Sequence, residues 1–523
     1  MTDVSDTKVL IVGAGPTGLT LACDLARRGV AHRIVERSPA PNRATRAKTI
    51  QPRSLEVLDD LGAVDSVLRN GIAGLPLRFH EPSGAVVDKP SISVRAPGSF
   101  HTPYSDALWI GQSEVELALR QRLERLGGRV EFGVEMVGVD QDDDAVNVTL
   151  RTPDGEQTAR AQYAVGADGG KSGMRKHIGL PLAGETYEQQ RWYLGDVTGP
   201  DLDRGHIHIW PSERGMLGLT PLGGDVWQFQ SPILPGEDPG TPSLEFYQRL
   251  FDERAGKDTV VLRSATWLSV YRVNARMVED YRQGRVLLAG DAAHVHSAAG
   301  GQGMNTGIQD AYNLGWKLAA VLDGAVPALL DTYAAERVPV ARTVLEMSTD
   351  KMSRVMGQAG DGSGDGLGPA LAAVGDASMN SGLGIHYRTS PISYRHGRSA
   401  SGVVAGDRAP NAAGLEGAEF SGDLFDLMRG AHWSLVAYEH TGPVGLDHAE
   451  PAHLRVHRIG SAPGNGLVDT EGEFQRVYQP LPGELILIRP DGYIAARTSA
   501  DRESDLISHV SSFRPTGAQV RLP

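Results

Sequence analysis

The stretch that decides the fold is residues 8–36, KVLIVGAGPTGLTLACDLARRGVAHRIVE. The short apolar run Lys8–Val12 predicts a buried parallel strand, and Pro16–Arg28 has the apolar periodicity of a helix. Ala31–Val35 predicts a second strand that ends at Glu36, so the stretch forms a βαβ unit. Its GxGxxG turn lets the backbone approach a pyrophosphate, whose charge the N–H groups of the helix N-terminus attract. The acid after the second strand can accept a hydrogen bond from a ribose hydroxyl. A structural glycine-rich turn is the alternative, and the order strand, helix, strand, acid favours dinucleotide binding.

A second glycine motif follows a later apolar strand. Residues 166–175 read GADGGKSGMR, directly after the strand predicted at Tyr163–Val165. Its Asp168-Gly pair is typical of a turn, which Ser172 and Arg175 would hold by hydrogen bonds. Taken alone, such a motif is more often structural.

A third motif comes in two pieces, GDAAH at 290–294 and GGQGMN at 300–305. Asp291 follows the buried strand predicted at Arg285–Ala289 and is placed to hold a ribityl hydroxyl of a flavin; a helix cap is the alternative reading of this residue. The glycines open a helix predicted over Asn305–Leu322. Its N-terminal N–H groups would face the electron-rich pyrimidine side of the flavin ring and stabilise negative charge there.

Length, composition and charge exclude several other classes. A chain of 523 residues predicts about two to four domains, and 40% hydrophobic with 22% charged residues indicates a soluble globular protein. The formal net charge of -13 disfavours a nucleic acid or an anionic membrane as partner. The polar start MTDVSDTK lacks a signal-peptide pattern, and no run of about 18 apolar residues predicts a membrane span. Cys23 is the single cysteine and cannot form an intrachain disulfide, which agrees with a cytoplasmic location; we expect no metal site.

The three motifs in this order resemble those of the class A flavoprotein monooxygenases, which include para-hydroxybenzoate hydroxylase, phenol hydroxylase and polyketide-tailoring hydroxylases. The resemblance covers about Lys8 to Pro339 and implies bound FAD. The residues that it assigns to cofactor binding are Gly13, Gly15, Pro16, Thr17, Gly18, Glu36, Arg37, Arg46, Gln112, Asp168, Asp291, Gly301, Gly303, Met304 and Asn305.

The same resemblance implies individual roles. Glu36 would bind the adenosine ribose, Arg46 would lie near the pyrophosphate, and Gln112 would contact the flavin. Asp291 resembles the acid of the flavin linker, and the backbone of residues 303–305 resembles the part that meets the isoalloxazine ring.

One departure from the family lies beside the flavin motif. After His294 the family commonly has one or two prolines, whereas this chain has Ser297-Ala298-Ala299. A proton relay that depends on the proline carbonyl of some members is therefore not carried over to this chain.

The resemblance also implies the organisation of an α/β fold. Short strands with Pro and Gly breaks fill residues 75–101 and 186–273, and they would form an antiparallel β-sheet substrate domain. This domain would be inserted into a Rossmann-like GxGxxG FAD domain made of residues 1–74, 102–185 and 274–390.

The last part of the chain, residues 402–523, resembles the thioredoxin-like C-terminal domain of phenol hydroxylase and polyketide hydroxylases. The likeness rests on AGDRAP at 405–410 and IRPDG at 488–492, and a Gly/Asp-rich segment at 358–368 precedes it. No cysteine lies in this part, so thiol chemistry is excluded there and a structural or dimer-side role is expected.

The family binds its substrate between the FAD domain and the β-sheet domain. Because strand side chains alternate between two faces, only one face of each strand can line that pocket. A histidine in the wall could act as the base that deprotonates a phenol, whereas ordinary core packing is the alternative for each wall residue. We interpret His294 and His296 as structural first. The expected wall residues are Tyr193, His206, His208, Trp210, Met216, Trp227 and Phe229.

The implied function is hydroxylation of an aromatic substrate, phenolic or polycyclic and polyketide-like, with O₂ and NAD(P)H through a flavin hydroperoxide. NAD(P)H would be a transient co-substrate, with NADPH favoured. Baeyer–Villiger oxygenation of a polyketide ketone is one alternative, and a non-catalytic flavoprotein that binds planar aromatics is an alternative of another class. The sequence has no Trp-x-Trp-x-Ile-Pro motif, which argues against a flavin halogenase. Monomer and homodimer both stay open.

Overall fold

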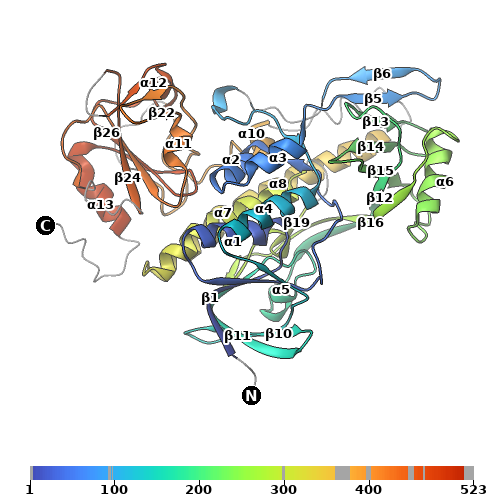
Figure 1. The fold of residues 1–523 in the computed structure, drawn as a ribbon, viewed down its shortest axis with the longest axis horizontal. Helices are drawn as coiled ribbons and strands as arrows, with labels where there is room; N and C mark the ends of the chain where they lie inside the picture. The colour runs from blue at the N-terminus through green and yellow to red at the C-terminus, as the bar shows by residue number, and fades with distance from the viewer. Residues whose placement is uncertain are drawn as a thin grey trace.

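The computed structural model describes residues 4–91, 96, 98–296, 301–359, 377–395, 402–445, 453–462 and 466–511. Ser297-Ala298-Ala299, Gly300 and most of the Gly/Asp-rich segment at 358–368 lie outside the described residues. Three sheet regions follow one another across the molecule, with the C-terminal sheet at one end and the sheet that carries α6 at the other (Figure 1).

The first sheet grows from the βαβ unit of residues 8–36. Its strand order is β17-β18-β11-β1-β2-β8, and β10 and β9 extend it from β11. Its neighbouring strands β18, β11, β1, β2 and β8 are parallel, as expected for buried apolar runs joined by crossovers. The strands are β1 (Val4–Val12), β2 (His32–Glu36), β8 (Val130–Phe132), β9 (Glu135–Gln141), β10 (Val146–Thr152), β11 (Gly155–Gly166), β17 (Arg282–Gln283) and β18 (Val286–Leu288).

Two helices pack together beside this sheet because small residues let them approach. They are α1 (Pro16–Arg27) and α7 (Gly303–Leu322), and α4 (Gln112–Arg125) also packs on α1. A methyl group at Gly307 would lie 2.3 Å from the Thr17 Oγ1 atom, and one at Gly315 would lie 2.2 Å from an Asp24 carboxylate oxygen. The close contact brings the N-termini of α1 and α7 to one side of the fold.

The second sheet joins the two separated β-rich blocks, which confirms that they form one sheet. Its order is β19-β16-β12-β15-β14-β13-β5-β6, and β5 of the first block pairs with β13 of the second. All other pairs printed for this sheet are antiparallel. The strands are β5 (Leu77–His80), β6 (Val86–Lys89), β12 (Ala183–Thr198), β13 (Ile207–Trp210), β14 (Leu217–Pro221), β15 (Trp227–Ile233), β16 (Ser264–Met277) and β19 (His294–Val295).

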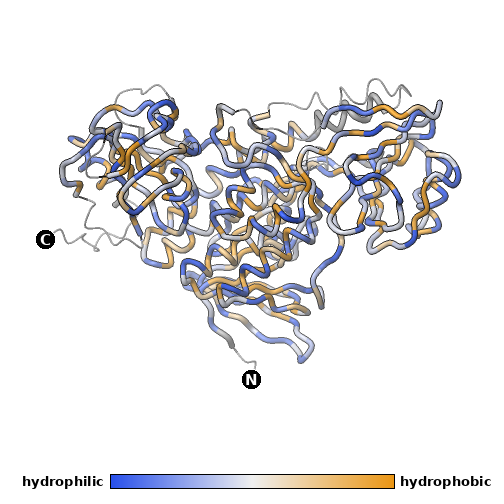
Figure 2. Tube along the Cα trace, turned by 45° about the horizontal axis from the view of Figure 1, so that its top comes forward, coloured by the Kyte–Doolittle hydropathy of each residue, from blue (hydrophilic) through white to orange (hydrophobic). Residues whose placement is uncertain are grey.

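The two faces of the second sheet bury different sets of side chains. One face packs against α6 (Leu244–Ala255), and Trp227 and Phe229 lie there with Tyr247 of that helix. The other face carries Trp192 and Ile209 and points toward the FAD-motif side of the molecule. Hydrophobic segments gather inside each region, with hydrophilic segments toward its outside (Figure 2).

The C-terminal sheet has the order β20-β27-β26-β23-β24-β25-β21-β22. The strands predicted at Trp433–Tyr438 and Leu485–Ile488 are present, as β23 and within β26. The sheet begins with β20, before the predicted boundary at residue 402. Its elements are β20 (Tyr394–Arg395), β21 (Leu415–Glu416), β22 (Ser421–Gly422), β23 (Trp433–Tyr438), β24 (Leu454–Gly460), β25 (Leu467–Asp469), β26 (Glu484–Ile488), β27 (Ile494–Ser499), α11 (Leu424–Met428), α12 (Glu473–Tyr478) and α13 (Glu503–Ser511).

The remaining elements connect these regions. A small three-stranded sheet has the order β3-β7-β4, and its strands all lie between the first and the second glycine motif in sequence. None of the helices within the described ranges has the combination of length and apolar character that a membrane span requires. These elements are β3 (Thr49–Ile50), β4 (Ile72–Ala73), β7 (Leu108–Trp109), α2 (Pro52–Asp60), α3 (Val64–Asn70), α5 (Gly173–His177), α8 (Asp331–Ala359) and α10 (Ala377–Ser381).

Candidate functional site

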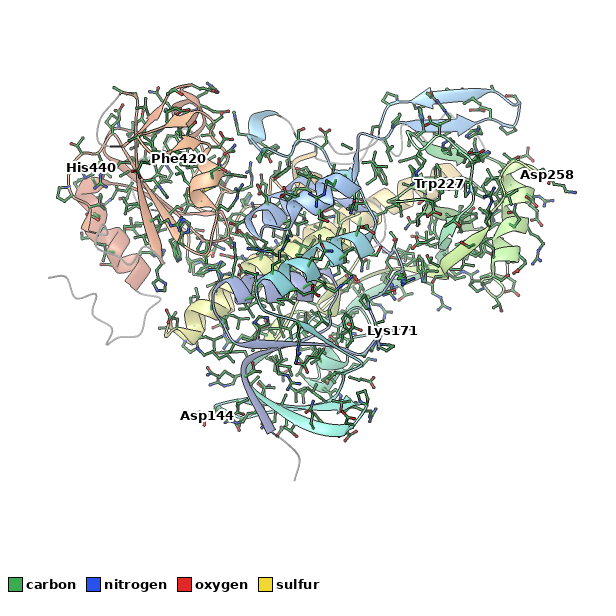
Figure 3. All side chains as sticks on the ribbon, viewed as in Figure 1. Asp144, Lys171, Trp227, Asp258, Phe420 and His440 are labelled. Carbon is green, nitrogen blue, oxygen red and sulfur yellow. The ribbon has the colours of Figure 1, made fainter. Side chains whose placement is uncertain are left out.

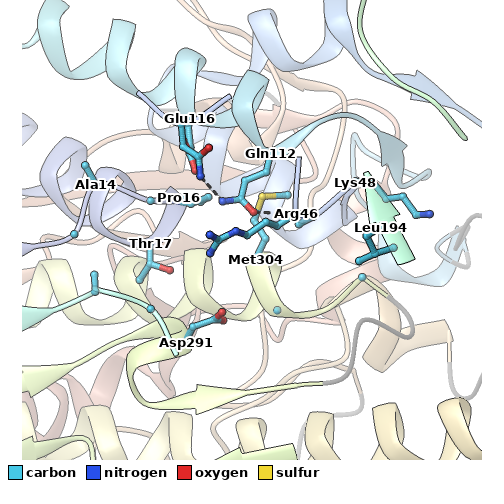
Figure 4. A pocket seen from close by; sticks show the side chains of 18 of the residues that line it. Ala14, Pro16, Thr17, Arg46, Lys48, Gln112, Glu116, Leu194, Asp291 and Met304 are labelled. Carbon is cyan, nitrogen blue, oxygen red and sulfur yellow. Dashed lines mark hydrogen bonds between the residues drawn. The ribbon is translucent and has the colours of Figure 1, made fainter. Parts of the chain in front are cut away.

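One cavity of about 630 Å³ brings the three glycine motifs together and opens onto the second sheet (Figure 4). Of the residues assigned to the cofactor from the sequence, two do not line it, namely Gly18 and Asn305. The assigned residues that do line it are Gly13, Gly15, Pro16, Thr17, Glu36, Arg37, Arg46, Gln112, Asp168, Asp291, Gly301, Gly303 and Met304.

The GxGxxG turn leaves free space at the N-terminus of α1. Gly13 has φ +105°, and a methyl group there would lie 2.3 Å from the Ala167 carbonyl oxygen, so only glycine fits. Gly18 is needed for packing rather than for the cavity wall, since a methyl group would lie 2.0 Å from the Gly13 carbonyl oxygen. Gly15 caps the helix without a side-chain hydrogen bond and has open space beside it. The first N–H groups of α1 therefore remain available to a diphosphate.

Glu36 is already oriented by the turn that it serves. Its Oε2 atom accepts from the Ala14 N–H at 3.0 Å, and its Oε1 atom accepts from the Ser38 N–H at 2.9 Å. Each carboxylate oxygen keeps acceptor capacity on the cavity side. The residue fits the role of accepting from the hydroxyls of a ribose.

Asp168 mainly braces its own turn. Its carboxylate accepts from the Ser172 hydroxyl at 2.6 Å and from the Gly173 N–H at 2.7 Å. The Arg175 guanidinium donates to the Ala292 carbonyl oxygen at 2.9 Å, which ties the second motif to the third. The turn pinned by Ser172 and Arg175, as predicted, is thus present and structural, although it also forms part of the cavity wall.

Asp291 differs because no protein group of the described residues donates a hydrogen bond to its carboxylate. The side chain is exposed to the cavity that it lines. Desolvation by the surrounding protein raises the pKa of Asp291, while His294 and Arg46 act in the opposite direction. An unpartnered acceptor at this place fits a ligand hydroxyl, as the ribityl chain of a flavin would provide.

The N-terminus of α7 forms the opposite edge of the same cradle. Gln302 caps it without a side-chain hydrogen bond, and no acidic residue lies in its first turn. Asn305 holds the loop in place instead of facing the cavity: its amide accepts from the Gln51 N–H at 2.8 Å and donates to the Thr49 carbonyl oxygen at 3.0 Å. The open N–H groups beside Gly303 suit the electron-rich edge of a flavin ring.

Gln112 is linked to an acid that sequence reasoning missed. The Gln112 Nε2 atom donates to the Glu116 Oε1 atom at 2.8 Å, one turn further along α4 (Figure 4). Burial raises the pKa of Glu116 to about 7. The two residues are four positions apart in sequence, which is the spacing that brings side chains together on one face of a helix.

Six of the seven residues expected in the substrate wall do not line this cavity. Only Met216 lines the cavity. Trp227 packs on the α6 side of the sheet, under Arg204 and away from Lys171 of the second motif (Figure 3). The other five that do not line the cavity are Tyr193, His206, His208, Trp210 and Phe229.

The expected residues miss the cavity because they point to the opposite face of their strands. The neighbouring positions on the same strands face the cavity, and a shift of one residue moves a side chain to the other face. The aromatic residues were attractive as ring-binding groups, yet they fill the apolar layer under α6. Gln228 and Gln230 lie at alternate positions of the buried strand β15, and these two polar residues could have indicated which face of the strand lines a cavity. The residues that face the cavity are Trp192, Leu194, Ile207, Ile209, Gln228 and Gln230.

The histidines named as candidate bases therefore do not reach the cavity. His208 is bonded to the His80 ring at 2.8 Å and to the Asp203 carbonyl oxygen at 2.8 Å, and His206 is bonded to the Asp203 carboxylate at 2.6 Å. His294 contacts the Asp310 carboxylate at 2.6 Å in the interior. These three histidines thus serve as bonded parts of the framework.

Two tryptophans on opposite faces provide a test of this assignment. Trp192→Phe should weaken the apolar contact between the cavity and the aromatic substrate by about 1 kcal/mol. The KM for that substrate should therefore rise roughly fivefold. Trp227→Phe should lower the free energy of unfolding by about 0.5–3 kcal/mol and leave KM unchanged. Steady-state kinetics and urea unfolding of both variants measure this. A KM effect from Trp227→Phe alone would reverse the assignment of the faces.

Comparison with known proteins was consistent with this geometry. Residues 6–348 match the family model described as FAD binding domain. A flavin-dependent monooxygenase of Mycobacteroides abscessus is 39% identical over 94% of this chain and 98% of its own length. Pentachlorophenol 4-monooxygenase of Sphingobium chlorophenolicum is 34% identical over 97% of each chain. The crystal structure of a ternary complex of aklavinone-11 hydroxylase with FAD and aklavinone has a TM-score of 0.82 at 28% identity, covering 98% of this chain and 100% of that one.

Proposed function

The chain belongs to the family of flavin-dependent monooxygenases with an FAD binding domain, and on that premise we propose that it uses NAD(P)H, with NADPH favoured, and O₂ to hydroxylate an aromatic substrate. The observation that carries the proposal is that the FAD cradle and an apolar sheet face line one continuous cavity. The substrate would be phenolic or a polycyclic, polyketide-like ring system. Pentachlorophenol 4-monooxygenase and aklavinone-11 hydroxylase, which are similar to this chain, support that class by their names.

The cradle residues would hold FAD along its whole length. Glu36 would accept from the adenosine ribose, and the N-terminus of α1 with Arg46 would bind the diphosphate. Asp291 would accept from the ribityl chain, and the N-terminus of α7 would lie beside the flavin ring. Bound there, FAD supplies the acceptor for the hydride and the means of activating O₂.

The chain's own part in the reaction is to position the substrate and to exclude water. Trp192, Leu194, Ile207 and Ile209 form an apolar wall on which a planar ring can lie. The open N-terminus of α7 would stabilise negative charge that develops beside it. Displacement of water by the bound ring protects the reaction from hydrolytic side reactions.

The finer architecture belongs to the same proposal. Residues 1–74, 102–185 and 274–390 would form the FAD domain, and residues 75–101 with 186–273 the substrate domain. The C-terminal part would be a thioredoxin-like domain; its parallel β23–β24 pair beside antiparallel β26 and β27 supports this. It would act structurally, in a protein that we place in the cytoplasm.

The test is anaerobic reduction of the FAD-loaded protein by NADPH, followed by product analysis. The described residues contain one dinucleotide turn of the GxGxxG type, so NADPH has to enter transiently. We expect a phenolic substrate to accelerate reduction by orders of magnitude, since gating by substrate prevents wasteful oxidation of NADPH. Mass spectrometry after admission of O₂ should find a product heavier by one oxygen atom.

Two outcomes would count against the proposal. Fast reduction that does not depend on substrate would contradict the gated mechanism, even if FAD is bound. A protein that binds planar aromatics but consumes neither NADPH nor NADH, across phenols, quinones and polycyclic polyketides, would be a binding protein.

A further inference from the structure

A polar cluster interrupts the apolar half of the cavity. The Lys48 ammonium group donates to the Gln230 Oε1 atom at 2.5 Å and lies 3.4 Å from the Thr220 hydroxyl. It also lies 5.7 Å from the centre of the Trp109 ring. The lysine comes from the segment just before β3, whereas its partners come from β14 and β15. The contact therefore joins the two halves of the cavity wall.

The position of Lys48 separates it from the cofactor cradle. In Figure 4 its side chain lies beside Leu194, on the far side of Arg46 from Glu116 and Ala14. It is thus placed in the part of the cavity that the apolar wall defines.

Lys48 has no carboxylate partner within ion-pair distance in the part of the chain that the structure describes. Burial lowers the pKa of Lys48 to about 7, and the more distant Asp196 acts in the opposite direction. Asp196 is held elsewhere, because it accepts from the Thr45 N–H at 2.6 Å, and burial raises its own pKa to about 6. A cation in these surroundings lacks a counterion, which an anionic ligand atom would supply.

Two other titratable groups near this half of the cavity are Tyr271 and His296. The Tyr271 hydroxyl donates to the His296 carbonyl oxygen at 3.0 Å, and the His296 Nε2 atom is bonded to the His294 ring at 2.8 Å. The His296 Nδ1 atom has no hydrogen-bond partner among the described residues, but burial lowers the pKa of His296 well below its usual value, so this ring is not a cation in the cavity. Arg46 and Lys171 belong to the glycine-motif side. Among the described residues that face the apolar wall, Lys48 is the cation best placed to meet a ligand oxygen.

We propose, on the premise of the function above, that Lys48 binds the phenolic oxygen of the substrate and holds it as the phenolate. In its neutral form the amine takes the proton of the phenol O–H group, which leaves an ammonium–phenolate pair and no other change. In its charged form it binds a phenolate that is already ionised. Gln230 and Thr220 orient the Nζ atom for this contact.

The assignment narrows the substrate class and the reaction. A phenolate places more electron density in its ring than a phenol, so it is the better partner for an electrophilic oxygen. The site would therefore select planar ring systems with an acidic hydroxyl, and it would favour ring hydroxylation over insertion beside a ketone. Lys48 takes the role of the base that the sequence had suggested for a histidine.

The test uses alizarin, a planar polycyclic phenol whose phenolate absorbs at longer wavelength than oxidised flavin. Titration of alizarin bound to the FAD-loaded protein should give a phenol pKa about 1–3 units below that of the free dye, as an opposite charge at close range predicts. Lys48→Met should abolish the shift or reverse it, because the pocket is then apolar and uncharged. Lys48→Arg should keep the bound dye ionised.

Lys171→Met is the matched control, since it removes another lysine of the same cavity from the glycine-motif side. It should leave the dye's pKa as in the wild-type protein. Flavin absorbance of each variant reports whether FAD is loaded. If Lys48→Met does not load FAD, Lys48→Gln replaces it, and the wild-type titration stands without any variant.

An unshifted pKa in the wild-type protein, or an equal shift in Lys48→Met, would overturn the proposal. Failure of the dye to bind would also overturn it, because the proposal names this class of ligand. Neither result touches the proposed function if the FAD-loaded protein still couples NADPH oxidation to oxygenation of some substrate. Loss of that coupling with an intact dye shift would instead refute the function and leave the phenolate site standing.

Discussion

Arg489→Met should lower the free energy of unfolding by about 3–5 kcal/mol, because it leaves buried carboxylates without their partner. Arg489 donates to the Glu336 carboxylate at 2.6 and 3.0 Å and to the Asp491 carboxylate at 2.5 and 2.9 Å. Lys317 donates to Glu336 from the other side at 2.7 Å. Urea unfolding followed by circular dichroism at pH 7.5 measures the change.

This cluster joins the C-terminal sheet to the FAD-binding part. Arg489 and Asp491 follow β26, whereas Glu336 and Lys317 lie on α8 and α7. Deletion of the residues after 402 would remove Arg489 and Asp491 from this cluster. It would also remove Arg408, which pairs with buried Glu56 at 3.0 Å. We therefore expect the shortened chain to lose solubility before it loses any catalytic step.

The stability loss caused by Arg489→Met should depend on pH in a defined direction. The Arg489 guanidinium and the Lys317 ammonium hold the pKa of Glu336 well below its usual value. A carboxyl group with a lowered pKa in the folded protein stabilises the fold above its unfolded pKa of about 4.3, and this contribution disappears as the pH falls through the folded pKa. The difference in the free energy of unfolding between the wild-type protein and Arg489→Met should hence be large at pH 7.5 and smaller near pH 4.

Arg476→Met is the matched control from the same region. Its side chain is 62% exposed and lies 3.7 Å from Glu473, so its loss should change stability by less than about 0.5 kcal/mol. Equal effects of the two substitutions would show that the buried cluster contributes nothing particular to stability.

Asp291→Ala should weaken FAD binding by about 10- to 150-fold, the equivalent of a lost charge-assisted hydrogen bond of about 1.5–3 kcal/mol. The same substitution should leave the apoprotein at least as stable as the wild-type protein at pH 7. Burial raises the pKa of Asp291, so the folded state binds the proton more tightly than the unfolded state, and ionisation at neutral pH destabilises the fold. Removal of the carboxyl group removes that penalty.

Glu36→Ala provides the comparison, because Glu36 would bind FAD and also accepts hydrogen bonds from the protein backbone. It should also weaken FAD binding, yet it deprives the Ala14 and Ser38 N–H groups of their acceptor and should destabilise the apoprotein. Titration of apoprotein with FAD and urea unfolding without FAD separate the two effects. Stoichiometric flavin in purified Asp291→Ala and Glu36→Ala proteins would show that the cofactor lies elsewhere.

Much of the fold could be predicted from local pattern. The strands β1, β2 and β18 and the helices α1 and α7 lie within a few residues of their predicted positions, since each is a local apolar run. Only the end of β11 was predicted, at Tyr163–Val165, whereas the strand begins at Gly155. The long helix α8 and the helix α6 were not predicted. Their residues matter through contacts with distant elements, as the link between Glu336 and Arg489 shows.

The sequence by itself determined the cofactor half of the site. Each cofactor motif can be recognised from a few neighbouring residues, because backbone conformation and helix N-termini are local properties. These motifs are the glycine turn, the acid after the next strand and the helix that a glycine opens. Only the tertiary structure decided the substrate half. Alternation says that Trp192 and Tyr193 face opposite sides, but the packing of α6 decides which side is filled and which remains a cavity. The same packing brought Lys48 to Gln230, 182 residues away in sequence, because burial is a property of the assembled layers and not of any strand alone.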